Sequence, residues 1–471
     1  MHLAALLLPC LTFVTIWTQI SAVPNPSRGG GLAEVFSWKA LDFQFPNDRA
    51  RKAAIDSGDF IPGNSVPMGV EVWKDKVFIS VPRLASGVPA SLNYVKLDAR
   101  NKSPKLIPYP NWEAQSLKDD NKGLKIVSPF RMNVDECDRL WMVDLGITDI
   151  KTSFTKLFQP RILAFDLNTN RLVLEREIEA SLLPSRTWIA NIIIDADKND
   201  CSNSYAYIPD LWGKVLIVYS LAQDKAFQIN HQYFNSDPLA GNYFIGGFNF
   251  RWDDGIFGVA LSPYDKRTRD RTLFFHSLSA YTEFAVSTKS IQNETASTDF
   301  YAYKLVGSRG PFGQSGAQSM DEKTGVLFFT LPHKNAVGCW NSMKYPNEYS
   351  PKTAITVFQN NVTMLYPSDL KVDKLGNVWV ISNRLPVFNH DALDQNDVNF
   401  RIFTGQASKI VENTACDLDY TRPPIFENQG GGGGYGHHHH NRNNKQRRAP
   451  AATSFATYFS RPLQPLVRPL I

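Results

Sequence analysis

One sequence pattern recurs six times along the chain and constrains its fold more than any other feature. Each copy has two short segments in which apolar and polar residues alternate, separated by an Asp-containing turn. The turn acids are spaced 52 to 70 residues apart, at Asp75, Asp135, Asp195, Asp265, Asp321 and Asp373. Alternation with a period of two predicts strands, and a repeat of this length has room for the four strands of a propeller blade. We therefore predict an all-β fold, a six-bladed β-propeller.

The clearest copy covers residues 367–388, with the sequence PSDLKVDKLGNVWVISNRLPVF. Strand-like segments flank a turn at residues 373–377, which predicts a β-hairpin. Asn383 and Arg384 follow the second strand, and Pro386 ends it. These polar side chains therefore lie at a strand end, where a rigid sheet can present them to a ligand.

Composition divides the chain into four parts. Residues 1–22 contain an apolar run that ends in small residues, which predicts a secretory signal peptide. Residues 23–35 form a leader rich in Pro, Gly and Ser, and residues 36–418 hold the repeats and thus the propeller. Residues 419–471 form a basic tail that contains Gly, His and Pro and is predicted to be disordered.

The end of the repeat region predicts how the ring closes. Residues 398–417 include a final strand, which we expect to pair with an early blade, so that no strand edge stays exposed. No segment after the signal peptide is long and apolar enough to span a bilayer. We therefore expect a soluble extracellular protein with no membrane partner.

The cysteines predict disulfides. Cys10 lies in the signal peptide, which leaves four cysteines and three possible connectivities. Proximity along the chain favours the pairs Cys137–Cys201 and Cys339–Cys416.

Three Asn-x-Ser/Thr sequences are candidate glycosylation sites, at Asn101, Asn293 and Asn361. All three lie in polar segments between predicted strands. We expect at least one of them to be glycosylated.

Charge argues against a nucleic-acid partner. The net charge of +5 arises from 50 basic and 45 acidic residues. Residues 429–471 hold six of the basic residues and none of the acidic ones, so the rest has 44 against 45, or −1. A neutral body offers no basic groove for phosphates. We expect the basic tail to contact cuticle or extracellular matrix instead.

The sequence contains no familiar catalytic motif. It lacks G-x-S-x-G, H-E-x-x-H and a P-loop, and its cysteine and histidine spacing predicts neither a metal site nor a cofactor. Asp caps tight turns by accepting hydrogen bonds from nearby backbone, so the recurring turn acids are interpreted as structural. The histidines of the repeat region are also interpreted as surface or packing residues; they are His231, His276, His333 and His390.

Several longer motifs resemble one family. They are IPGNSVPMGVEVW, VDECDRLWMVD, NAVGCWN, VWVISNRLPVF, VNFRI and VENTACDL. Over about residues 34–418 the chain resembles the insect yellow and major royal jelly protein family, and more closely its yellow branch, which is associated with cuticle pigmentation. The resemblance implies a secreted six-bladed propeller with the two disulfides above. It also implies a link to melanin formation and, for some members of the family, conversion of dopachrome or binding of biogenic amines.

The resemblance also implies a ligand site. Salivary amine-binding relatives use a Thr, an Asn and a Phe in the sixth blade, which correspond here to Ser368, Asn383 and Leu385. Loss of the aromatic ring removes a cation–π contribution of roughly 0.5–2 kcal/mol. Arg384 replaces a small residue, and its charge would repel an ammonium and favour an anionic group such as a catechol carboxylate. Asp369, beside Ser368 at the start of the same strand, is a further candidate.

Three functions are compatible with these features. The first is a secreted pigmentation protein that binds a catechol-derived or biogenic-amine ligand in an axial pocket. The second is a dopachrome-converting isomerase or decarboxylase, and the third is a structural cuticle or egg-coat protein anchored by its tail. A calcium-dependent lactonase is a more distant alternative for a propeller.

Overall fold

The computed structural model describes residues 31–118 and 123–421. The predicted signal peptide, residues 1–22, lies outside the described residues. The predicted disordered tail lies outside them from residue 422 onward.

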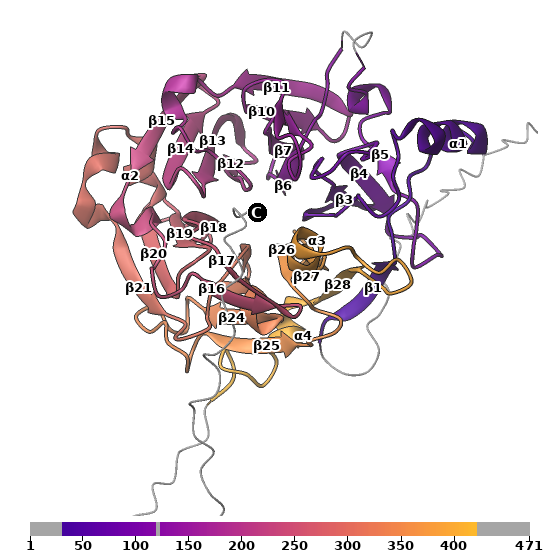
Figure 1. Ribbon diagram of the computed structural model, residues 1–471. Coiled ribbons are helices and arrows are strands. Elements are labelled where there is room, and N and C mark those ends of the chain that lie inside the picture. The colour runs from indigo at the N-terminus through magenta and orange to yellow at the C-terminus, as the bar shows by residue number, and fades with distance from the viewer. Residues whose placement is uncertain (1–30, 119–122, 422–471) are drawn as a thin grey trace, which may run out of the picture. The chain divides into compact units, whose positions relative to one another are not determined.

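Six four-stranded antiparallel sheets stand around a central axis in the described part of the chain (Figure 1), which confirms the predicted six-bladed β-propeller. The first blade contains β2 (Gly69–Trp73), β3 (Lys76–Ser80), β4 (Leu92–Lys96) and β5 (Ile107–Pro108). The second contains β6 (Pro129–Val134), β7 (Arg139–Asp144), β10 (Arg161–Asp166) and β11 (Arg171–Glu177). The third contains β12 (Ile193–Asp197), β13 (Asp200–Asp210), β14 (Val215–Ser220) and β15 (Lys225–Asn230).

The remaining three blades complete the ring. The fourth contains β18 (Ile256–Leu261), β19 (Thr272–Ser277), β20 (Thr282–Ser287) and β21 (Lys304–Ser308). The fifth contains β22 (Gln318–Asp321), β23 (Val326–Leu331), β24 (Ala336–Asn341) and β25 (Ile355–Gln359). The sixth contains β26 (Pro367–Val372), β27 (Asn377–Ser382), β28 (Phe400–Gln406) and β1 (Ala33–Trp38).

Short elements decorate the blades. Two small hairpins are β8 (Ile147–Thr148) with β9 (Thr155–Lys156), and β16 (Asn242–Ile245) with β17 (Phe248–Arg251). The α-helices are α1 (Asp48–Ser57), α2 (Thr288–Gln292), α3 (Leu385–His390) and α4 (Ala407–Val411). None of these helices, which are those of the described residues, has the length and apolar character that crossing a membrane requires.

The ring closes through the N-terminal strand, which corrects our expectation for residues 398–417. Strand β28 does not join an early blade; it is the third strand of the sixth blade and pairs with β27. Strand β1 is the fourth, with Trp38 opposite Phe400 and Ala33 opposite Thr404. One sheet thus joins both ends of the repeat region, and β1 begins inside the segment assigned to the leader.

In four blades the predicted acid holds the first hairpin turn by accepting hydrogen bonds from turn backbone; these acids are Asp135, Asp265, Asp321 and Asp373. The prediction is wrong for Asp195, which lies within β12 and accepts hydrogen bonds from Tyr207 and Gln292 instead. Asp373 accepts a hydrogen bond from the backbone N–H of Asn377 and another from the indole of Trp379, both at 2.9 Å. Asp135 accepts the indole N–H of Trp141 at 2.8 Å in the same way. These carboxylates satisfy turn backbone and a buried indole, which is a structural role.

Apolar side chains pack between the faces of neighbouring sheets. Between the fifth and sixth blades, Phe328 and Val337 contact Leu370, Val380 and Phe403 in one buried cluster. Burial on both faces explains why these strands carry nearly continuous apolar runs.

Both predicted disulfides are confirmed. Cys137, in the turn between β6 and β7, is bonded to Cys201 in β13, so this bridge joins the second and third blades. Cys339, in β24, is bonded to Cys416, which follows α4, so this bridge fixes the segment after the last strand to the fifth blade. Bridges that close loops of this size stabilise a fold by about 4 kcal/mol each in the chain-entropy description.

A fully buried charge network joins the fourth and fifth blades. Glu283 lies 2.8 Å from His276 Nδ1 and accepts a hydrogen bond from Arg309 at 2.7 Å. Gln318 donates to its other oxygen at 3.0 Å. Burial alone would raise the pKa of Glu283, but His276, Arg309 and Gln318 together hold this pKa below its ordinary value.

We predict that Glu283→Gln lowers the free energy of unfolding by about 3–5 kcal/mol, because Arg309 then stays buried without its counter-charge. The stabilisation from a lowered carboxyl pKa is present above the unfolded-state pKa of 4.5 and is lost as the pH falls through the folded-state value. Urea denaturation should therefore show a difference between wild type and variant that shrinks in acid.

The control is Glu412→Gln, which removes a solvent-exposed carboxylate paired with Lys409. Such pairs contribute about 0–1 kcal/mol. Equal, small losses in both variants would contradict the role assigned to the buried network.

Candidate functional site: the axial cavity

Neighbouring blades are separate sheets, and polar side chains bridge them, in most cases between inner strands. A hydrogen bond between a side chain of one blade and the backbone of the next occurs at all six junctions. The bridges are Val134 N to Glu71 Oε2 (3.1 Å), Ile194 N to Asn133 Oδ1 (2.9 Å), Asn191 Nδ2 to Phe257 O (2.9 Å), Gln318 Nε2 to Phe274 O (3.0 Å), Val372 N to Ser319 Oγ (3.0 Å) and Val70 N to Asp369 Oδ2 (3.0 Å). The axis is therefore polar because buried backbone groups there need partners.

Arg131 spans the axis. From β6 in the second blade, its guanidinium donates to Ser368 O at 2.6 Å and to Ala190 O at 3.2 Å. Its Cζ also lies 4.5 Å from the centre of the Phe257 ring, and its Nε lies 3.8 Å from Asp369. The side chain thus contacts the third, fourth and sixth blades and is only 4% exposed. Burial lowers the pKa of Arg131, and the charge of Asp369 opposes this shift.

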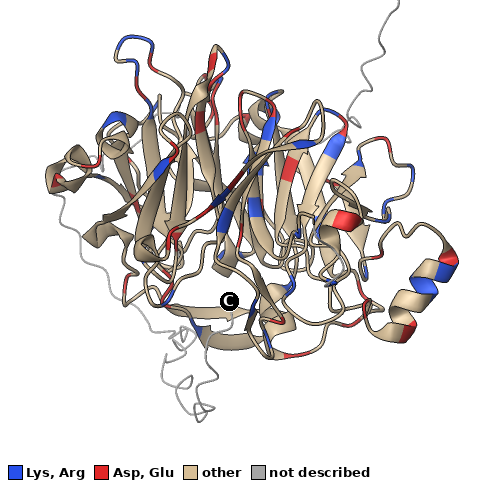
Figure 2. Ribbon diagram, turned by 90° about the horizontal axis from the view of Figure 1, so that it is seen from above, with Lys and Arg blue, Asp and Glu red and all other residues tan. Residues whose placement is uncertain are grey.

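A cavity of about 500 Å³ lies on the axis at the end formed by the turns between first and second strands. We call it the turn-end cavity. All six inner strands line it, through residues that include Glu71, Asn133, Ile194, Leu261, Ser319 and Lys371. Figure 2 shows that charged residues lie within strands as well as on the loops.

The turn-end cavity carries both signs of charge. At its rim Glu136 and Lys374 lie 3.8 Å apart, and Arg271 donates to Glu322 at 2.6 Å. Its strand residues are more enclosed, since Glu71 is 4% exposed and the Glu136 side chain 41%. Within residues 31–118 and 123–421, no three His, Cys, Asp or Glu side chains gather as a metal-binding group.

Glu71 has the most unusual electrostatics in this cavity. Burial raises the pKa of Glu71 from 4.5 to about 7, with a small further rise from Asp369. Lys371 and the backbone N–H groups of Val72 and Val134 oppose the shift. A carboxyl group with this pKa exists in both protonation states at neutral pH.

The predicted sixth-blade residues meet at the opposite end of the axis, which we call the closed end. Ser368 Oγ donates to Met68 O at 3.0 Å, and Asn383 Nδ2 donates to Pro67 O at 2.7 Å. The Leu385 backbone N–H donates to Asn383 Oδ1 at 3.0 Å. The structure therefore brings these residues together near the axis, but their polar atoms bind the protein itself.

The two charged members of the predicted site also have protein partners. Asp369 accepts a hydrogen bond from Lys371 at 3.0 Å, in addition to its bridge to the first blade. Arg384 donates to Asp397 at 2.6 Å and to Asn399 at 3.2 Å. The lining of the turn-end cavity does not include any of the five predicted residues, and their role in ligand binding stays a prediction.

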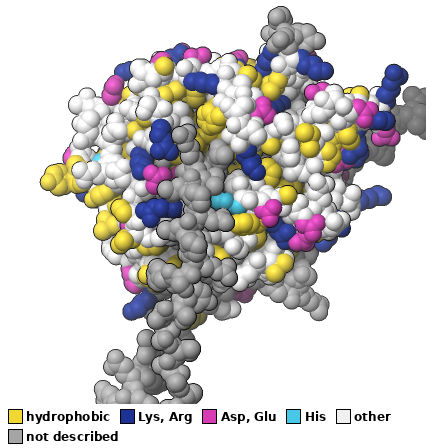
Figure 3. All heavy atoms as spheres, viewed as in Figure 1, with side chains coloured by type: hydrophobic (Ala, Val, Ile, Leu, Met, Phe, Trp, Pro, Cys, Tyr) yellow, Lys and Arg dark blue, Asp and Glu magenta, His cyan; other side chains and the backbone are white. Residues whose placement is uncertain are grey.

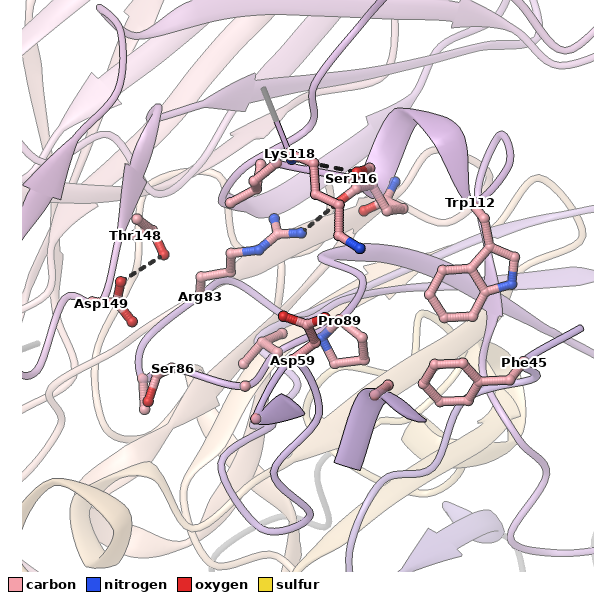
Figure 4. Close-up of a pocket in the computed structure, with 17 residues that line it drawn as sticks. Phe45, Asp59, Arg83, Ser86, Pro89, Trp112, Ser116, Lys118, Thr148 and Asp149 are labelled. Atoms are coloured by element: carbon pink, nitrogen blue, oxygen red, sulfur yellow. Dashed lines mark hydrogen bonds between the residues drawn. The ribbon is translucent and has the colours of Figure 1, made fainter. Parts of the chain in front are cut away.

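A second cavity, of about 530 Å³, lies beside the first blade (Figure 4). Phe45 and Trp112 stack along one side, with ring centres 4.8 Å apart. Arg83 reaches into its wall and donates to three backbone carbonyls, those of Gln115, Ile126 and Val127, at 2.6–2.8 Å. Because three carbonyls from two neighbouring segments hold this guanidinium, its role here is structural, and the turn-end cavity is the stronger candidate.

Comparison with known proteins identifies the family. The family described as "Major royal jelly protein" matches residues 127–416. "Protein yellow" of Drosophila madeirensis is 40% identical over 417 residues, which cover 88% of this chain and 72% of that protein. The chain belongs to the yellow and major royal jelly protein family. "Protein yellow" of Drosophila melanogaster is likewise 40% identical over 405 residues, 85% of this yellow-family chain and 73% of that protein.

Solved structures add only a distant likeness of fold. A virginiamycin B lyase from Staphylococcus aureus aligns with a TM-score of 0.38 and 10% identity, over 73% of this chain and 95% of that one. At this distance the likeness carries no argument about function. The proteins that are similar in sequence, by contrast, confirm the predicted resemblance to the yellow branch.

We predict that Asn383→Ala lowers the free energy of unfolding by about 1–3 kcal/mol, because Pro67 O and the Leu385 N–H lose their buried partner. Chemical denaturation measures this loss. Asn396→Ala, at an exposed position, is the control and should change stability by less than about 0.5 kcal/mol. A stability like that of wild type for Asn383→Ala would show that these hydrogen bonds do not hold the closed end together.

Proposed function

We propose that this yellow-family protein is secreted and binds a small catechol-derived ligand in the turn-end cavity, as part of melanin formation in cuticle. The observation that carries this proposal is a cavity lined by all six inner strands, with a carboxyl group and an ammonium group in its wall. Its volume of about 500 Å³ lies within the range of about 300–1,000 Å³ that is usual for small-molecule sites.

The lining suits the chemistry of a catechol amino acid. Val72, Ile194 and Leu261 supply apolar surface for a ring, while Glu71 and Lys371 supply an acceptor and a donor. Apolar walls with a few placed polar groups are the usual composition of such sites. Lys371, rather than the predicted Arg384, is the cation proposed to bind an anionic group of the ligand, because it is the positively charged strand residue of this cavity.

Ligand binding at the closed end is less favourable than binding in the turn-end cavity. Arg131 lies two residues before Asn133 on β6, so its side chain stands between the closed end and the turn-end cavity. A ligand beside Ser368 and Asn383 would have to replace hydrogen bonds to Pro67 and Met68. In the turn-end cavity Glu71 and Lys371 also have protein partners, but each retains capacity for a further hydrogen bond to a ligand.

Secretion is supported by the two disulfides, which persist in oxidising compartments. Asn101, Asn293 and Asn361 are all exposed in the structure and so are accessible to glycan transfer. The proposed attachment of the basic tail to extracellular matrix concerns residues outside the described ones.

We predict that the chain expressed in insect cells appears in the medium and that N-glycosidase lowers its apparent mass. Substitution of Asn101, Asn293 and Asn361 by Gln, one at a time, identifies the modified sites by loss of one mass step. Retention inside the cell, in a form that N-glycosidase does not change, would contradict the proposal of secretion.

The proposed ligand class is tested by calorimetric titration with dihydroxyphenylalanine and with dopamine, which lacks the carboxylate. We predict tighter binding of dihydroxyphenylalanine, because Lys371 can pair with its carboxylate. Lys371→Met should abolish most of the difference, roughly tenfold for one charge-assisted hydrogen bond, while the exposed control Lys409→Met should keep it. Equal affinity of the wild type for both compounds would contradict the charge argument, and binding of neither would contradict the ligand class.

A further inference from the structure

Glu71 is a carboxyl group held in a fixed position on the wall of the turn-end cavity. It occupies the middle of β2 and lines the cavity. One of its oxygens accepts the backbone N–H of Val72 at 2.9 Å, and the other accepts that of Val134 at 3.1 Å. Each carboxylate oxygen can accept two hydrogen bonds, so each retains capacity for a donor from a ligand.

The charged groups that act on Glu71 come from the neighbouring strand β26. Lys371, which also lines the cavity, favours the ionised form of Glu71, while Asp369 favours the neutral form. The strand on the other side, β6, presents the backbone N–H of Val134 to Glu71. Burial raises the pKa of Glu71 more than the partners of the ionised form lower it, so this pKa is about 7. A new donor from a ligand would therefore shift a group that is about half ionised at neutral pH.

A catechol complements this wall. It has two adjacent ring oxygens, one of which can donate its proton to a carboxylate while the other accepts from an ammonium. Glu71 and Lys371 are such an acceptor and donor, carried by strands of the first and sixth blades, which adjoin in the ring. A ligand with only an amine or only a carboxylate does not need both an acceptor and a donor.

We propose that Glu71 is the residue that recognises the catechol hydroxyl, and that ligand binding drives Glu71 to its carboxylate form and releases a proton. This inference rests on the proposed function of the turn-end cavity and adds the group that selects the ligand. The hydroxyl keeps its proton and donates a hydrogen bond, so the proton released to solvent is the one that neutral Glu71 carried. Affinity for a catechol then rises as the pH increases through neutrality.

The test is calorimetric titration of the full chain with dihydroxyphenylalanine at pH 7, in two buffers that differ in ionisation enthalpy. The wild type should release about half a proton per ligand, because a group with a pKa near 7 is half protonated there. Glu71→Gln should bind about tenfold or more weakly at pH 8 and release no proton. Asp75→Asn, an exposed change in the turn of the same hairpin, should behave as wild type.

Phenylalanine serves as the second probe, since it keeps the ammonium and carboxylate but lacks the hydroxyls. It should bind without proton release. Equal proton release with phenylalanine would overturn the assignment to the hydroxyl, because Glu71 would then respond to the ammonium. The wild-type buffer comparison needs no variant, so the inference stays testable if Glu71→Gln fails to fold.

The outcomes separate the two proposals. If the wild type binds neither dihydroxyphenylalanine nor dopamine, the proposed function fails. If it binds dihydroxyphenylalanine without proton release, or if Glu71→Gln binds equally well, the role of Glu71 fails while the proposed function stands.

Discussion

Hydrogen bonds from side chains to backbone across neighbouring inner strands are the interaction on which the ring depends. Strands within a blade pair their backbone N–H and C=O groups with each other, but inner strands of different blades belong to separate sheets. Their buried N–H and C=O groups need partners, and the carboxyl, amide and hydroxyl groups of Glu71, Asn133, Asn191, Ser319 and Asp369 provide them. A propeller assembled this way has a polar axis by necessity.

That necessity connects the fold to the site. Glu71 both bridges the first and second blades and forms part of the cavity wall, so a change in its protonation acts on the ring and on the ligand at once. Arg131 likewise ties three other blades together through Ser368, Ala190 and Phe257. On the face drawn in Figure 3, basic and acidic side chains are interspersed, in keeping with a body of nearly zero net charge.

Much of the fold could be predicted from the sequence because its determinants are local. Most of the turn acids mark a blade because they hold the first hairpin turn of that blade, and the cysteines lie close enough along the chain to favour one pairing. Ring closure could not be predicted this way. Strand β1 pairs with β28, whose residues lie more than 360 positions away, and no short-range pattern records that contact.

The turn-end cavity was not predicted from the sequence. Resemblance to relatives pointed to Ser368 and Asn383, which do lie near the axis. Glu71 and Lys371 were not singled out, because in the sequence they look like the solvent-facing polar residues of an alternating strand. A signal was nevertheless present. The position four residues before the turn acid is polar in four of the six copies, at Glu71, Arg131, Asn191 and Asp369, and all four side chains lie at the axis.

The most direct measurement of the central claim is a crystal structure of the protein with dihydroxyphenylalanine bound. The account predicts density for the ring inside the turn-end cavity, with its oxygens within hydrogen-bonding distance of Glu71 and Lys371. Density beside Ser368 and Asn383 at the closed end, or away from the axis with the turn-end cavity free of ligand, would contradict it.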